Sequence, residues 1–248
     1  MTHQLARFSI SAMEDPAVKF MPIRLSVLGK EEVVGIYGKN KDEMPDRARY
    51  LQPSAAISFR AHLGDKVQVS DMLRTAESSL SARRRGRGAQ RPGYSGHNFG
   101  FSIDLAVSAT MRRRKLASKK ELDLWMASKG WWCHRRDHER DHEEWHYNFF
   151  GRDAGKWVRD GDRKTSAGLE RMIASKYERW WQKMTEKDAQ RALTRLGMYD
   201  GDIDGSIGPI SREAVRSFQR AWLVGETGSL NLMTKRTLAF VSSDRILV

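Results

Sequence analysis

Two short stretches of this sequence hold the residue types that bind a divalent metal ion and use it for hydrolysis. His97 and Asp104 lie in the first stretch, and His146 follows about forty residues after Asp104. Two imidazoles and a carboxylate can take three positions around a tetrahedral zinc ion and leave the fourth for water. Glu143 is a spare carboxylate that can take a proton from such a water and pass it to a leaving amine. These four residues therefore predict a metal-dependent hydrolase.

Strands are predicted to position two of the metal ligands. Residues 101–107 and 145–150 are rich in β-branched or aromatic side chains, which favour strands, and they carry Asp104 and His146. Residues three apart on a strand face opposite sides of the sheet. We therefore expect Glu143 at the bend before its strand, where the alternation has not begun.

The rest of the N-terminal two thirds mixes strand and helix patterns. Further strands are expected at 21–28, 33–38 and 67–69, and helices at 55–63, 78–85 and 119–129. This mixture predicts an α+β fold. We expect a small, mainly antiparallel sheet with helices on one side and the metal in a groove across it.

The motif around the candidate ligands resembles the signature of the zinc peptidases that trim peptidoglycan. That family includes D-alanyl-D-alanine carboxypeptidases, D-Ala-D-Ala dipeptidases and the L-alanyl-D-glutamate endopeptidases of phage lysins. Its signature is Ser-x-His-x-x-Gly-x-Ala-x-Asp followed by Glu-x-Trp-His. The matching residues here are Ser95, His97, Gly100, Ser102 in place of Ala, Asp104, Glu143, Trp145 and His146. The resemblance covers roughly residues 20–150, and the change at position 102 replaces one small residue with another.

The resemblance implies a role for each matched residue at the metal. His97, Asp104 and His146 would bind one zinc ion per chain. Glu143 would act first as general base and then as general acid.

The resemblance also implies residues that would contact the substrate. Arg74 follows Ser70 in the Ser-x-x-x-Arg context that is typical of the family. It would hold the scissile carbonyl oxygen or a substrate carboxylate. An arginine keeps its proton near neutral pH, so it can stabilise a developing oxyanion. Ser95 and Trp145 would bind the substrate.

Three further histidines precede the last ligand at intervals of four residues. His134, His138 and His142 could stack with His146 on one helical face and imitate a metal site. Arginine and acidic residues alternate with them, which favours a solvated turn or loop instead. We expect these three histidines not to be ligands.

The C-terminal region resembles the three-helix peptidoglycan-binding module. Helices are expected at 186–196, 211–222 and 230–240, with apolar residues at helical spacing. Residues 196–209 follow the Leu-Gly-x-Tyr-x-Gly-x-Ile-Asp-Gly-x-x-Gly-Pro signature of that module, and Ser211 stands where Thr is usual. The aspartates of this stretch could also belong to a calcium loop, but its twelfth position, counted from Asp200, is a serine rather than the required glutamate.

Length and composition predict two domains and a connector. The chain has 248 residues, of which 40% are hydrophobic and 30% are charged. This is enough to bury one medium core and one small core. We expect a zinc peptidase domain at 1–155, a basic connector at 156–184 and a peptidoglycan-binding domain at 185–248.

The chain carries a formal net charge of +13, with arginine runs at 83–87 and 112–115. Such runs could bind nucleic acid through its phosphates. They lack a recognition-helix or base-stacking motif, so we expect no specific nucleic acid partner. Attraction to an anionic cell envelope explains the runs equally well.

The sequence shows no apolar run of transmembrane length and no signal peptide pattern at its start, and Cys133 is its one cysteine. We expect a monomer that is made in the cytoplasm and does not insert into the membrane. It would reach the wall through a separate pore-forming protein, as phage lysins do.

Together these features predict a zinc-dependent peptidoglycan peptidase, most readily an L-alanyl-D-glutamate endopeptidase of the endolysin type. A D-alanyl-D-alanine carboxypeptidase is the alternative activity. A non-catalytic wall-binding protein is the alternative of another class.

Overall fold

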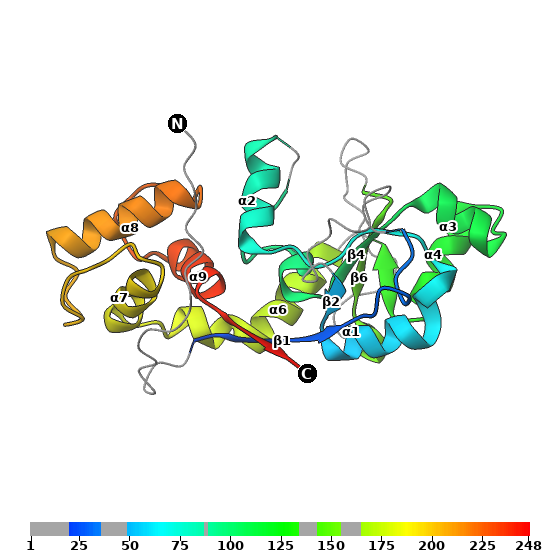
Figure 1. Ribbon diagram of the computed structural model, residues 1–248, viewed down its shortest axis with the longest axis horizontal. Helices are drawn as coiled ribbons and strands as arrows, with labels where there is room; N and C mark the ends of the chain where they lie inside the picture. Colours follow the sequence, from blue (N-terminus) through cyan, green and yellow to red (C-terminus); the bar gives the residue numbers. More distant parts are fainter. Residues whose placement is uncertain (1–19, 36–48, 87–88, 134–142, 155–164) are drawn as a thin grey trace.

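The computed structural model describes residues 20–35, 49–86, 89–133, 143–154 and 165–248 (Figure 1). The fold is mixed α+β, as predicted, with two small sheets and a helical C-terminal region. No helix in the described part of the chain is both long and apolar enough to cross a bilayer.

The larger sheet carries the candidate site. It contains β3 (Val69–Asp71), β4 (Ser102–Leu105), β5 (Trp131–Cys133) and β6 (His146–Phe149), in the order β3-β4-β6-β5. Each neighbouring pair is antiparallel, so the predicted antiparallel sheet is confirmed.

The two central strands divide the sheet into an apolar and a polar face. Successive side chains of a strand point to opposite faces. On β4 and β6 the apolar face is formed by Ile103, Leu105, Tyr147 and Phe149, all in one hydrophobic cluster. The other face carries Ser102 and Asp104 from β4, paired in register with Asn148 and His146 from β6. The polar side chains of β4 and β6 therefore lie on one face of the sheet, and their apolar side chains pack on the other.

Helices cover the apolar face. α1 (Pro53–Ser58) continues into a π-helical turn (Phe59–Leu63), and a 3₁₀ turn (Gly64–Lys66) follows. α4 (Lys119–Ala127) contributes Leu122 and Met126 to the same cluster. α3 (Val107–Arg114) links β4 to α4, and α2 (Ala76–Arg84) precedes the loop that leads to His97.

A second sheet joins the first described strand to the end of the chain. β1 (Pro22–Val27) pairs antiparallel with β2 (Tyr50–Leu51) and parallel with β7 (Asp244–Leu247). Figure 1 shows β7, in red, running along β1, in blue. The sequence pattern did not predict β7.

The C-terminal region contains the three predicted helices: α7 (Glu186–Arg195), α8 (Pro209–Ala221) and α9 (Leu232–Val241). Thr185 and Asp188 form a capping box at the start of α7. α8 begins at Pro209, two residues before the prediction, because proline is well suited to the first helical position.

Two buried glutamines hold the loops of this region. The side-chain oxygen of Gln190 accepts the N–H of Gly205, and that of Gln219 accepts the N–H of Gly228. Their amide nitrogens donate to groups that include Ser211 Oγ and Thr234 Oγ1, one at the start of each following helix. Each glutamine thus satisfies polar groups of one loop inside the region.

A long helix connects the part of the chain that carries the larger sheet to the C-terminal region. α6 (Thr165–Gln182) lies in the predicted connector, whose residues 156–164 fall outside the described residues. It packs against α9, and Phe99 contacts both helices through Tyr177, at 5.0 Å between ring centroids, and Phe240, at 5.3 Å. One hydrophobic cluster therefore extends from β1 through α6 to α9.

Several predicted boundaries were wrong. The predicted helix at 55–63 changes to a π-helical turn after Ser58, and the expected strand at 67–69 lies two residues later. Residues 33–35 form no strand, although the carbonyl of Val34 accepts the N–H of Val69, and 36–38 lie outside the described residues.

Candidate metal centre

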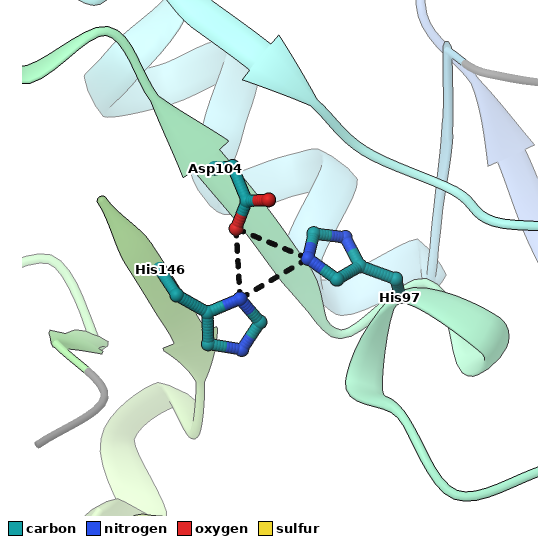
Figure 2. Close-up of side chains that lie close together, drawn as sticks. All are labelled: His97, Asp104 and His146. Carbon is teal, nitrogen blue, oxygen red and sulfur yellow. Dashed lines mark hydrogen bonds and ion pairs between the residues drawn. The ribbon is translucent and has the colours of Figure 1, made fainter. Parts of the chain in front are cut away.

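Three buried side chains converge on the polar face of the larger sheet. Asp104 on β4 lies directly opposite His146 on β6, and His97 comes from a 3₁₀ turn (Gly96–Phe99) beside them (Figure 2). Asp104 Oδ1 lies 2.8 Å from His146 Nδ1 and 3.1 Å from His97 Nε2, and the two nitrogens are 3.1 Å apart. Within the described ranges this is the one cluster of three or more residues able to hold a metal ion.

The turn that carries His97 is held by its own first residue. Ser95 Oγ accepts the N–H of His97 at 3.3 Å, and the Asn98 side chain accepts the N–H of Ser95. Gly96 has no room for a side chain, because a Cβ there would lie 1.9 Å from Ser102 Oγ. The Ser-Gly-His sequence is therefore required locally to bring the imidazole against the sheet.

Each imidazole has one nitrogen that faces Asp104, the inner nitrogen, and one that faces away, the outer nitrogen. Hydrogen bonds on the outer nitrogens orient both rings. His97 Nδ1 donates to the carbonyl of Met72, and His146 Nε2 donates to Asn148 Oδ1 at 3.1 Å. A carbonyl oxygen can only accept, so in the neutral form of each ring the proton lies on the outer nitrogen and the inner nitrogen carries a lone pair. These lone pairs and Asp104 Oδ1 point at one another, and such a group of acceptors is stable around a cation. The donor set and its outer partners fit a divalent metal.

The electrostatics of the cluster also favour positive charge. Burial acts to lower the pKa of His97, but attraction to Asp104 and their hydrogen bond outweigh it and raise that pKa above its ordinary value. Burial opposes the charge on Asp104, yet the charge on His97 and His146, when no metal is bound and the rings are protonated, holds the pKa of Asp104 well below its ordinary value. Asp104 is therefore an anion, and it faces both rings.

Arg74 lies beside the cluster and holds the second oxygen of Asp104. Its guanidinium contacts Asp104 Oδ2 at 3.2 Å and Asp71 Oδ2 at 2.6 Å, and 23% of the side chain is exposed. Asp104 Oδ1 is thereby left facing the histidines. The predicted substrate contact of Arg74 stays a prediction.

The remaining predicted site residues lie close to the cluster. Glu143 precedes a tight turn in which its carbonyl accepts the N–H of His146 at 3.1 Å, so it lies at the bend where it was expected. Trp145 is 46% exposed next to His146, and Ser95 is buried as the cap of the 3₁₀ turn. Their catalytic and substrate-binding roles stay predictions. The expectation about His134, His138 and His142 falls outside the described residues.

Two residues at the site were not assigned from the sequence. Asn148 orients His146, and Asp71 orients Arg74. Alternation could have found Asn148, because it lies two residues after His146 on the same strand and so on the same face. No sequence pattern marks Asp71, because its contact with Arg74 depends on how the chain leaves β3.

A chain of hydrogen bonds connects the C-terminal region to the site. The buried Arg236 on α9 donates to the carbonyl of Gly93 at 2.8 Å and forms a two-pronged ion pair with Glu170 on α6. The N–H of Gly93 donates to Asn98 Oδ1 at 3.0 Å, and Asn98 Nδ2 donates to the carbonyl of Arg74 at 3.0 Å. The loop before His97 is therefore held from both sides.

Comparison with known proteins identifies the C-terminal region. Residues 187–238 match a protein-family model described as "Putative peptidoglycan binding domain". The match spans α7, α8 and most of α9, and it supports the predicted wall-binding module. No curated protein matches the chain. The candidate metal centre lies outside the matched residues, and no peptidase family is assigned to it.

Proposed function

We propose that this protein is a zinc-dependent peptidase that hydrolyses the peptide stem of bacterial peptidoglycan. The bond that we propose is cut joins L-alanine to D-glutamate, as in phage endolysins. The observation that carries this proposal is the convergence of two imidazole lone pairs and the Asp104 carboxylate on one buried point. The family match at residues 187–238 supports peptidoglycan as the substrate.

His97, Asp104 and His146 would hold the ion. Zinc in such a site supplies a Lewis acid that polarises a carbonyl group and makes water nucleophilic near neutral pH. Glu143, at the turn before His146, accepts the proton of the attacking water and returns it to the leaving amine. Asn148 and the Met72 carbonyl keep the two imidazoles oriented throughout.

Arg74 has two roles in this proposal. One side of its guanidinium holds Asp104, which keeps that carboxylate aligned. The part that remains exposed can donate to the oxygen of the scissile carbonyl, where negative charge develops. Asp71 aligns the guanidinium for both contacts.

The wall-binding region raises the concentration of scissile bonds near the site without changing the chemistry there. We further propose that the protein acts on the wall from the periplasm after release through a separate pore-forming protein. Cleavage of the stem at its base would detach whole stem peptides and weaken the wall.

The decisive experiment is mass spectrometry of fragments released from purified sacculi by the full-length protein with zinc. Free stem peptides starting at D-glutamate are expected. Loss of a single D-alanine would instead indicate a carboxypeptidase. A protein that pellets with the wall but releases nothing, with or without zinc, would be a non-catalytic wall-binding protein.

Glu143→Ala and Glu144→Ala form a matched pair for this assay. The two residues are adjacent carboxylates on the same turn, so the variants differ only in which carboxylate is lost. Only the first should abolish release. Full release by Glu143→Ala would show that Glu143 takes no part in the mechanism.

A further inference from the structure

Ser102 and Asn148 form a buried pair on the polar face of the larger sheet. They lie directly opposite each other on β4 and β6, and neither side chain is exposed. The hydroxyl of Ser102 donates to Asn148 Oδ1 at 2.5 Å. The same oxygen accepts the outer N–H of His146 at 3.1 Å. One amide oxygen therefore receives hydrogen bonds from both a serine and a candidate metal ligand.

The backbone of the 3₁₀ turn passes over this pair. A Cβ at Gly96 would lie 1.9 Å from Ser102 Oγ and 3.0 Å from Asn148 Oδ1. The same Cβ would lie 3.0 Å from Leu169 Cδ2 on α6. Because backbone and apolar atoms enclose the pair so closely, its polar groups depend on hydrogen bonds within the protein.

The amide of Asn148 can turn either of its two ends toward His146. With the oxygen toward the ring, the outer nitrogen carries the proton and the inner nitrogen keeps its lone pair for a metal ion. With Nδ2 toward the ring, the outer nitrogen has to accept. In a neutral ring the proton then lies on the inner nitrogen, where a metal ion would otherwise bind. The orientation of this amide therefore decides whether His146 can be a ligand.

Ser102 stabilises the orientation that suits a metal ion. Asn148 Nδ2 has no hydrogen-bond partner among the described residues, so the amide is held by the contacts of its oxygen. Turning the amide over would break the bond from Ser102. The hydroxyl proton has no other acceptor in the described part of the chain, and leaving a buried donor unpaired costs free energy. Without the hydroxyl, the oxygen would keep a single donor, which is the histidine itself.

Position 102 is also where this chain departs from the zinc peptidase signature, which has alanine there. Alanine has no side-chain donor, so the bond to Asn148 is a feature of this chain rather than of the signature. Replacing Ser102 with alanine therefore removes the hydroxyl and adds no bulk beneath Gly96.

We propose that Ser102 is a positioning residue for His146 and acts through Asn148. The hydroxyl holds the amide oxygen toward the ring, the amide oxygen holds the proton on the outer nitrogen, and the inner nitrogen stays available for the metal ion. This inference rests on the metal site of the proposed function, but not on which bond is cut.

Zinc affinity, measured in the full-length protein by competition with a chelator, tests this role. Ser102→Ala should weaken zinc binding by about two- to tenfold, which is the net effect of one hydrogen bond. Ser242→Ala is the matched control, because it also removes a buried hydroxyl, which donates to the carbonyl of Leu238 at 2.7 Å at the end of α9. The control should leave zinc affinity unchanged. Thermal unfolding shows that both variants are folded.

A double-mutant cycle separates action through Asn148 from a general loss of packing. In the Asn148→Ala background, Ser102→Ala should cause no further loss of zinc affinity, because the amide that it orients is already absent. A purely structural role of Ser102 would give the same loss in both backgrounds.

Two results would overturn this role alone. They are an unchanged zinc affinity of Ser102→Ala and an equal loss with and without the Asn148 side chain, each in a protein that binds zinc before any change. A full-length protein that binds no zinc would instead overturn the proposed function, and the role of Ser102 with it. None of these measurements needs turnover, so a failure of the proposed peptidase activity is recognised separately in the sacculus assay.

Discussion

The guanidinium of Arg236 and the carbonyl of Gly93 are joined by a hydrogen bond of 2.8 Å, although 143 residues separate them. Arg236 also lies 4.0 Å from the ring centroid of Tyr94 and 4.9 Å from that of Trp181. A residue of the matched wall-binding region therefore forms part of the support of the loop that carries His97. Arg236 thus links the C-terminal region to the loop before His97 through direct contacts.

Replacing Arg236 tests how much these contacts stabilise the protein. Arg236→Gln should lower the free energy of unfolding by about 1–3 kcal/mol, because the buried Gly93 carbonyl loses its donor while the half-exposed Glu170 can be solvated. Thermal unfolding measures the change. Arg220→Gln, in an exposed ion-pair network on α8, is the control and should stay within about 0.5 kcal/mol. An equal change in the free energy of unfolding for the two variants would mean that the contacts of Arg236 add no stability.

The proposed metal ligands and the proposed base should be separable by metal analysis. His97→Ala, Asp104→Ala and His146→Ala should each reduce the bound zinc, because each removes one of three ligands. Glu143→Ala should keep about one zinc per chain while turnover falls by at least about a hundredfold. Zinc content by mass spectrometry and the sacculus assay check both. Zinc lost from Glu143→Ala would make Glu143 a ligand instead.

The orientation of His146 should depend on Asn148. Asn148→Ala removes the acceptor for His146 Nε2. Loss of such an outer partner typically costs about 10–100-fold in metal affinity. Competition with a chelator measures this affinity. The control is Asn231→Ala, which removes the cap of α9 and should cost about 1 kcal/mol of stability with metal affinity unchanged. Unchanged affinity in Asn148→Ala would show that the imidazole is oriented by other contacts.

A shortened chain ending at Thr185 tests the predicted domain boundary. It lacks three contacts made by the C-terminal region. These are the pairing of β7 with β1, the ring contact of Phe240 with Phe99 and the hydrogen bond from Arg236 to the carbonyl of Gly93. We expect it to unfold at lower temperature and with less cooperativity than the full chain, because part of a shared hydrophobic cluster is removed. Circular dichroism during heating measures this. An unchanged transition for the remaining residues would show that residues 1–185 fold independently, as the sequence pattern suggests.

The site residues His97, Asp104 and His146 were predicted from their types and from the resemblance of their motif, and the structure shows how local geometry brings them together. The alternation on β4 and β6 places Asp104 and His146 on one face, and the Ser-Gly-His turn brings His97 to them. The three helices of the C-terminal region follow from their apolar periodicity and their glycine and proline boundaries. These features depend on residues that are near one another in the sequence.

Long-range contacts were not predictable from the same patterns. The residues of β7 have no alternation that distinguishes them from a loop, and their pairing depends on the exposed edge of β1. Arg236 lies on a helix whose charged residues are expected to face solvent, yet it is buried against a loop from the other half. The separation into modules was predicted from composition, which carries no information about shared packing.

The parallel pairing of β1 with β7 also sets an order for synthesis of the chain. The strand at Pro22–Val27 leaves the ribosome more than two hundred residues before its partner at Asp244–Leu247. Until that partner is made, one edge of β1 has unpaired backbone groups that can associate with other chains. Closing so large a loop is slow compared with forming local contacts. Nascent or prematurely terminated chains should therefore depend on chaperones and aggregate more readily than the finished protein.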